Sequence, residues 1–205
     1  MLERLRTLFF LPLIVFVFGC NNEPDTNDTY FGGKIMNPKS DHVILYSQEK
    51  AIDTFFLDQN NSFLEKLDVQ EGLFYFKHGP EHQYVYLEPN DSILIRLNTW
   101  TFDESLVFSG KGADRNNMLI DCFTDAEKDK RKFYKLYKLE PKEFATKVQK
   151  IEKLKMERYE QFLIRNKNET QQFKEVLKMA LLYPIYSKIE DYPLARRRGS
   201  NTLRL

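Results

Sequence analysis

The sequence predicts an α+β protein, with an antiparallel β-sandwich over residues 30–112 followed by a helical region of about three helices over residues 113–193. Two observations support this fold class. From Tyr30 to Ser109, short runs of Val, Ile, Leu, Phe and Tyr are separated by the Asn, Asp, Gly and Pro residues of tight turns. After Gly110 the apolar residues recur every three or four positions, which is the period of an amphipathic helix.

The strands are expected at the apolar runs of the first region. The run Ile93–Leu97 shows the pattern best, because Ile93, Ile95 and Leu97 share one face and the opposite face is mostly polar. Regular short strands of this kind favour antiparallel sheets packed face to face. The expected strands are 43–46, 52–57, 63–68, 73–77, 84–87 and 93–97, after a first strand that opens at Gly33-Lys34-Ile35.

The helices are expected between clear boundary residues. Asp114 is a candidate cap for a first helix ending near Leu139, and Pro141 suits the first turn of a second helix that ends near 166. A third helix is expected over 169–190, with a kink at Pro184. Residues 194–205 lack an apolar period, so we expect a disordered or truncated tail there.

The N-terminus predicts export. An apolar run from Leu8 to Gly19 follows two arginines and would rise only ~18 Å as a helix, too short to cross a hydrocarbon core of roughly 30 Å. Gly19-Cys20 resembles the lipobox of bacterial lipoproteins, which implies that residues 1–19 are a signal peptide, that Cys20 is lipidated and that 20–29 form a tether. Asn21 is compatible with an outer-membrane location facing the periplasm. A plain signal peptide cut nearby is the alternative.

Composition gives few hints about partners. Lys and Arg number 31 against 30 Asp and Glu, so a net charge of +1 offers no overall attraction to nucleic acid, and we expect none as a partner. If Cys20 is acylated, Cys122 is the remaining cysteine and has no partner for a disulfide. A zinc site of the multi-cysteine type is therefore not expected. The predicted partner that remains is the membrane, through the lipid.

Cys122 and a histidine group are the candidate reactive residues. Cys122 lies four residues from both Met118 and Ala126, so we expect it on the packing face of its helix, as a small apolar residue rather than a redox group. A zinc site assembled from the histidine group competes with a simpler interpretation, a solvated turn, which we prefer. That group consists of His78, Glu81 and His82, with His42 as a third imidazole.

Two further stretches have simple interpretations. Lys128–Lys138 mixes basic and aromatic residues, as binders of single-stranded nucleic acid do, but adjoining acids favour a solvated helix face with the aromatics turned inward. Asp103 and Glu104 form a carboxylate pair that we assign to solubility. The sequence has no Cys-x-x-Cys, nucleophile-elbow or phosphate-loop motif, so we predict no catalytic, cofactor-binding or metal-binding residue and expect no enzymatic activity.

Several motifs resemble, in order, the region that precedes the redox domain in TlpA-like envelope thiol-disulfide oxidoreductases. They are Gly33-Lys34-Ile35, Ile52-Asp53 with Asn61-Ser62-Phe63, Tyr86-Leu87-Glu88-Pro89-Asn90-Asp91-Ser92, Phe108-Ser109-Gly110-Lys111-Gly112 and Asn116-Asn117. That family consists of thioredoxin-fold lipoproteins with an extra β-rich domain, and its activity lies in a Cys-x-x-Cys pair on the later thioredoxin fold. The resemblance implies a chain truncated before that fold, so no catalytic residue is carried over.

The resemblance implies a lipid-anchored, non-catalytic accessory or interaction domain associated with these oxidoreductases, with a thioredoxin-like redox module as partner. Its contact surface would be a sheet edge or the groove between sandwich and helices. A truncated fragment of such an enzyme is one alternative. Another is an envelope lipoprotein that binds a ligand through exposed aromatic residues of the sheet.

Overall fold

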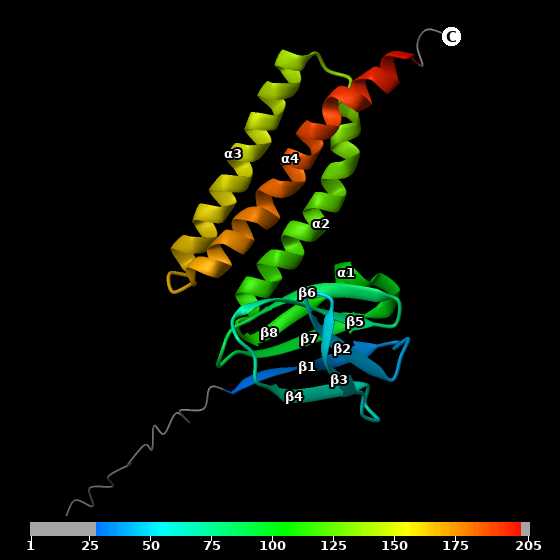
Figure 1. Cartoon of the computed structure of the whole chain (residues 1–205), viewed down its shortest axis with the longest axis vertical. Helices are drawn as coiled ribbons and strands as arrows, with labels where there is room; N and C mark the ends of the chain where they lie inside the picture. Colours follow the sequence, from blue (N-terminus) through cyan, green and yellow to red (C-terminus); the bar gives the residue numbers. More distant parts are fainter. Residues whose placement is uncertain (1–27, 202–205) are drawn as a thin grey trace, which may run out of the picture.

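The computed structural model describes residues 28–201, which form two four-stranded sheets and a set of helices (Figure 1). The α+β class predicted from the sequence is therefore confirmed. The strands are β1 (Thr29–Met36), β2 (His42–Ser47), β3 (Lys50–Phe56), β4 (Ser62–Leu67), β5 (Gly72–His78), β6 (Glu81–Leu87), β7 (Ser92–Asn98) and β8 (Val107–Lys111). The helices are the 3-10 turn η1 (Thr99–Thr101), α1 (Phe102–Ser105), α2 (Ala113–Leu136), α3 (Pro141–Arg165) and α4 (Gln171–Asn201).

The two sheets have the strand orders β4-β1-β7-β8 and β3-β2-β5-β6. Neighbouring strands are antiparallel except β1 and β7, which are parallel with Tyr30 beside Ser92 and Met36 beside Asn98. The expectation of wholly antiparallel sheets is thus wrong at this pair. The physical reason is the long excursion between the two strands, during which the chain builds the whole second sheet and returns to run beside β1 in the same direction.

The inner faces of both sheets share one hydrophobic core. Phe31 of β1 meets Phe76 of β5 across the two sheets, with ring centroids 5.7 Å apart. The predicted alternation in β7 is confirmed, since Ile93, Ile95 and Leu97 are buried while Leu94 remains exposed. Strand residues at alternate positions therefore supply this core, as the pleat requires.

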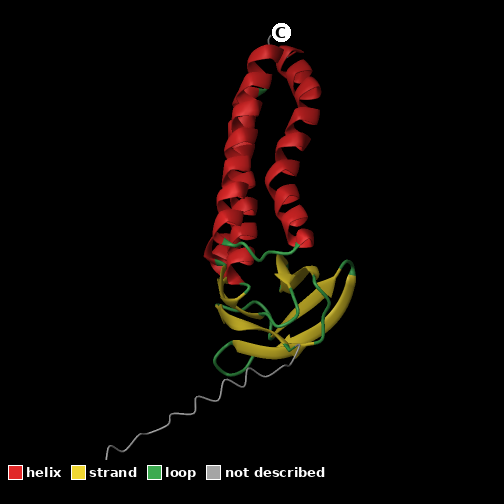
Figure 2. Cartoon of the chain, turned by 90° about the vertical axis from the view of Figure 1, so that its left-hand side faces the viewer, coloured by secondary structure: helices red, strands yellow, loops and turns green. Residues whose placement is uncertain are grey.

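The long helices α2, α3 and α4 extend from one side of the sheets (Figure 2), and in chain order they run away from the sheets, back toward them and away again (Figure 1). The described residues contain four α-helices, so the expected number of about three is wrong. The additional helix is α1, a single short turn inserted between β7 and β8. Asp114 is not the cap of α2, because Gly112 occupies that position with a φ of +91° and Asp114 lies inside the first turn. No helix among residues 28–201 is long and apolar enough to cross a membrane.

Helix α4 continues to Asn201, well past the end that the apolar period suggests. Contacts with the turn between α2 and α3 accompany this extension. The Tyr192 hydroxyl and the Arg196 guanidinium both donate to the backbone carbonyl of Leu139, at 2.8 and 2.6 Å, and the Tyr192 ring stacks on Phe144. The part of the expected tail that the structure describes, 194–201, is helical.

Two consecutive asparagines tie α2 to both sheets. The Asn116 amide accepts from the Tyr86 N–H and donates to the Tyr86 carbonyl, at 2.6 and 2.9 Å, on the free edge of β6. The Asn117 amide makes the same pair of bonds to the backbone of Phe108 in β8, both at 2.9 Å. Each amide takes the place of a neighbouring strand, so the first turn of α2 closes one edge of each sheet.

Candidate functional site

An apolar groove lies between the outer face of β5 and β6 and the helices α2 and α4. Its volume is about 440 Å³. Most of its lining residues are aliphatic or aromatic, and none carries a charge. They are Leu73, Gln83, Tyr84, Leu119, Ile120, Cys122, Phe123, Ala126, Val176, Met179, Ala180, Tyr183 and Pro184. This set is called the groove below.

The strand and helix periods explain how the groove is built. On β5 and β6, Phe74 and Val85 point into the core between the sheets, so their neighbours Leu73 and Tyr84 point outward. On the helices, lining residues recur every three or four positions, for example Phe123 four residues after Leu119 on α2. The groove therefore forms where an outer sheet face meets two helix faces.

The groove leaves large apolar side chains in contact with solvent. Met179 is 64% exposed, Tyr183 is 68% exposed and Tyr84 is 47% exposed. The single amide of the lining, that of Gln83, is already used, because its Nε2 donates to Asp103 and its Oε1 accepts from the Tyr84 N–H, each at 2.9 Å. The lining thus suits an apolar surface rather than a polar ligand.

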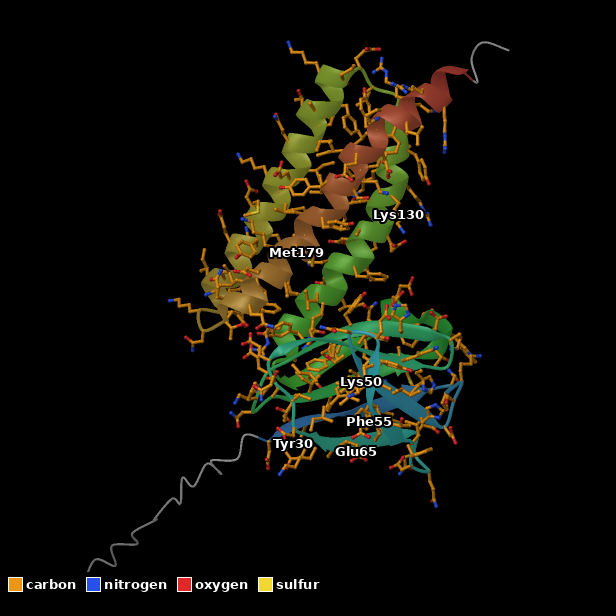
Figure 3. All side chains as sticks on the ribbon, viewed as in Figure 1. Tyr30, Lys50, Phe55, Glu65, Lys130 and Met179 are labelled. Atoms are coloured by element: carbon orange, nitrogen blue, oxygen red, sulfur yellow. The ribbon has the colours of Figure 1, made fainter. Side chains whose placement is uncertain are left out.

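A second hollow of about 260 Å³ continues the groove between α2 and α4. It shares Cys122, Phe123 and Tyr183 with the groove. It is also lined by charged residues such as Lys130 of α2, which lies farther from the sheets than the groove residue Met179 of α4 does (Figure 3). The ammonium of Lys130 is 2.6 Å from Glu127, in an ion pair of the same helix. The groove is therefore apolar near the sheets and becomes polar away from them.

Cys122 lies in the wall shared by the two hollows and is only 2% exposed. Its predicted place on the packing face of α2 is confirmed. Burial raises the pKa of the thiol to about 11, and the nearby cations Arg158 and Lys155 offset this only in part. Cys122 is thus a protonated thiol at neutral pH, which is a poor nucleophile.

The expectation of a solvated turn for the histidine group is wrong for His78. This side chain is buried, its Nε2 accepts from the Lys39 N–H and its Nδ1 donates to the His42 carbonyl, each at 2.9 Å. Burial lowers the pKa of His78, in keeping with the neutral ring that these two bonds require. His82 and Glu81 remain exposed, and residues 28–201 contain no group of three or more His, Cys, Asp or Glu that could hold a metal ion.

The prediction for the basic and aromatic stretch 128–138 is confirmed except at Tyr134, which is 70% exposed because it lies beside, and not on, the helix face that Phe133 and Tyr137 share. Phe133 and Tyr137 are buried, whereas the lysines of this stretch are exposed. Asp103 has a more definite place than the sequence indicates, since it lies in α1 and accepts the hydrogen bond from Gln83 at 2.9 Å. It therefore supports a side chain that lines the groove.

Sequence reasoning missed the ion cluster at the base of the groove, which we call the Arg115 cluster: Arg115, Glu88, Asp91 and Glu169. The Arg115 guanidinium contacts both Asp91 oxygens at 2.6 Å, Glu88 at 3.1 Å and Glu169 at 3.5 Å. Its members come from the β6–β7 turn, α2 and the α3–α4 connection, so no local spacing relates them. In the sequence, the presence of two acids in one turn is only a weak indication of this cluster.

The outer face of the β3-β2-β5-β6 sheet carries further aromatic residues. The rings of Tyr46 and Tyr75 stack at 4.7 Å, and Tyr75 meets the edges of Tyr84 and His82. Tyr84 also lines the groove, so the aromatic face and the groove form one continuous surface.

No family model, curated protein or solved structure matches the chain. The resemblance to the TlpA-like family therefore stays a prediction. The signal peptide, the lipidation site Cys20 and residues 21–27 of the tether lie outside the described residues.

Proposed function

We propose that the chain is an exported, lipid-anchored accessory module of the cell envelope, and that it binds a thiol-disulfide oxidoreductase without catalysing a reaction itself. In this proposal Cys20 carries the lipid, the protein faces the periplasm from the outer membrane, and the two packed sheets are a β-sandwich. The partner is a thioredoxin-like redox module, as the sequence resemblance implies.

The groove is the observation that carries this proposal. Contiguous exposed apolar side chains mark contact sites on soluble proteins, and here Leu73, Phe123, Met179 and Tyr183 gather around one concave surface. The lining has no charge and its one amide is occupied, so an extended peptide backbone would find few hydrogen-bond partners there besides the hydroxyls of Tyr84 and Tyr183. Apolar side chains presented by a folded partner avoid that cost.

The groove also supports a second candidate function, the binding of a small apolar ligand. Its volume of about 440 Å³ is typical of small-molecule sites, and the aromatic face beside it adds Tyr46 and Tyr75.

A photo-crosslinking amino acid tests the proposal in cells that produce the full chain. One variant carries the crosslinker at Met179 in the groove, and the control carries it at Ile164 on α3, since these side chains are similarly exposed at 64% and 68%. We expect crosslinks from position 179, but not from 164, to a protein that contains a thioredoxin fold with a Cys-x-x-Cys pair.

A second pair of variants ties the crosslink to the groove itself. Ala126→Trp fills the groove, whereas Ala145→Trp places the same side chain on an exposed position of α3. The first substitution should abolish the crosslink and the second should preserve it. Crosslinks to small apolar molecules alone would favour the ligand-binding function, and identical products from positions 179 and 164 would contradict a role for the groove.

A further inference from the structure

The Arg115 cluster lies where the walls of the groove meet the sheets. Glu88 and Asp91 follow β6, Arg115 is in the first turn of α2, and Glu169 precedes α4 by two residues. Nearby, the Tyr86 and Thr170 hydroxyls both donate to one oxygen of Glu71, which precedes β5. Contacts at this one place therefore hold β5, β6, α2 and α4 together, and these are the four elements that line the groove.

The cluster contains more negative than positive charge. Three carboxylates surround one guanidinium, and their side chains are only 3% exposed for Asp91, 9% for Glu169 and 19% for Glu88. The other charged groups that act on these carboxylates are Glu71 and Asp114, which add negative charge, and Lys111, which adds positive charge. Burial of uncompensated negative charge is unfavourable, so the cluster is under electrostatic strain when all of its acids are ionised.

Glu88 is the member best placed to accept a proton. Asp91 is fully engaged, because it contacts Arg115 through both oxygens and also accepts from the Glu88 N–H at 2.8 Å. Glu88 reaches Arg115 through Oε2 alone, and its buried Oε1 has no hydrogen-bond partner. Burial raises the pKa of Glu88, the neighbouring acids act in the same direction, and Arg115 opposes them.

We propose that Glu88 is a proton-operated latch at the base of the groove. When Oε1 takes up a proton, the excess negative charge falls by one while Oε2 keeps its contact with Arg115, so the start of α4 is held more tightly against the sheets. When the proton leaves, repulsion loosens this attachment and the groove opens more often. The inference rests on the proposed function, because it assigns a regulation to the groove.

The sign of the pH dependence follows from the raised pKa. The closed state binds the proton more tightly than the open state, so its extra stability is complete at low pH and is lost as the pH rises through the pKa of the closed state. Each unit of pKa difference between the two states corresponds to about a tenfold change in the opening equilibrium.

Hydrogen exchange of the full chain tests the latch without any partner. The readout is the protection of backbone amides in 171–177, at pH 5.5 and 7.5, corrected for the intrinsic pH dependence of exchange. We expect opening to be rarer at pH 5.5, by at most about tenfold for each unit by which the pKa of the closed state exceeds that of the open state. Glu88→Gln, which is neutral at both pH values, should weaken this dependence and raise the protection at pH 7.5 toward that of the unchanged chain at pH 5.5.

Two more variants sharpen the test. Glu169→Gln relieves the same repulsion from another position and should also raise protection at pH 7.5, whereas Glu160→Gln, exposed on α3, should leave the pH dependence complete. A flat profile for the unchanged chain, or a full pH dependence in Glu88→Gln, would overturn the latch. Either result leaves partner crosslinking at position 179 unaffected, so failure of the latch is distinguishable from failure of the proposed function.

Discussion

Replacing Asn116 by alanine should destabilise the protein strongly, because it removes both hydrogen bonds that close the edge of β6. The amide is buried, as is Tyr86, so water cannot take its place without disturbing the packing. A buried backbone group without a partner costs roughly 1–3 kcal/mol. Loss of two such partners predicts a decrease of about 2–6 kcal/mol in the free energy of unfolding.

Asn117 provides a matched comparison, since it makes the same two bonds to Phe108 but is only half-buried. Water can replace part of its role, and Asn117→Ala should lower the free energy of unfolding by about 1–3 kcal/mol, the net value of two ordinary hydrogen bonds. Asn60→Ala, in an exposed turn between β3 and β4, is the control and should change it by less than about 0.5 kcal/mol.

Urea denaturation of the three variants and the unchanged chain measures these differences, provided that the dependence of the free energy on urea stays the same in all four. The order of effects matters more than the absolute values. If Asn117→Ala costs as much as Asn116→Ala, or if Asn116→Ala has an effect within the range of the control, burial of the amide does not determine its contribution and the reasoning is refuted.

Three other predictions concern His78, Cys122 and Gly110. Because the pKa of His78 is lowered in the folded state, its contribution to stability is complete above about pH 6.5 and is lost on acidification. His78→Ala should therefore lower the free energy of unfolding, measured by urea denaturation, more at pH 7.5 than at pH 5.0. An equal decrease at both pH values would contradict a neutral ring. A shift of the Cys122 pKa from 9.0 to about 11 should slow its alkylation at pH 8 about hundredfold relative to the unfolded chain. The full chain should accordingly reduce insulin no faster than a free thiol does, and catalysis that disappears in Cys122→Ser would show otherwise. At Gly110, φ is +92° and a Cβ would lie 1.9 Å from the Ser92 carbonyl oxygen, so Gly110→Ala should lower the free energy of unfolding by about 2 kcal/mol or more, whereas Gly72→Ala, with its nearest contact at 3.7 Å, should change it little.

The sequence predicts the elements of this fold well where the signal is local. The alternation in β7 identifies Ile93, Ile95 and Leu97 as core residues, and the helical period places Cys122 on a packing face. Turn residues likewise mark the ends of most strands. Local spacing does not predict the parallel pairing of β1 with β7, because that depends on where the chain returns after building the second sheet.

The site was harder to predict for a similar reason. Leu73, Phe123 and Met179 look like ordinary core residues in the sequence, and only the packing of three distant segments leaves them around an open groove. His78 shows the opposite error, since the nearby Gly79-Pro80 indicates a solvated turn while the long-range contacts with Lys39 and His42 bury the ring. Interactions between residues far apart in the sequence decide both cases.

Because the helices are long, a small rotation at the base of the groove would displace their far ends by a larger distance. Helix α2 has 24 residues and so extends about 36 Å, and its first turn is fixed to the sheets through Arg115 and Asn116 while the rest projects away from them (Figures 1 and 2). A rotation of about 5° about this anchored end would displace the far end of such a rod by roughly 3 Å. Any rotation at the first turn of α2 would therefore produce its largest displacement at the far tip, where Tyr192 and Arg196 contact the α2–α3 turn.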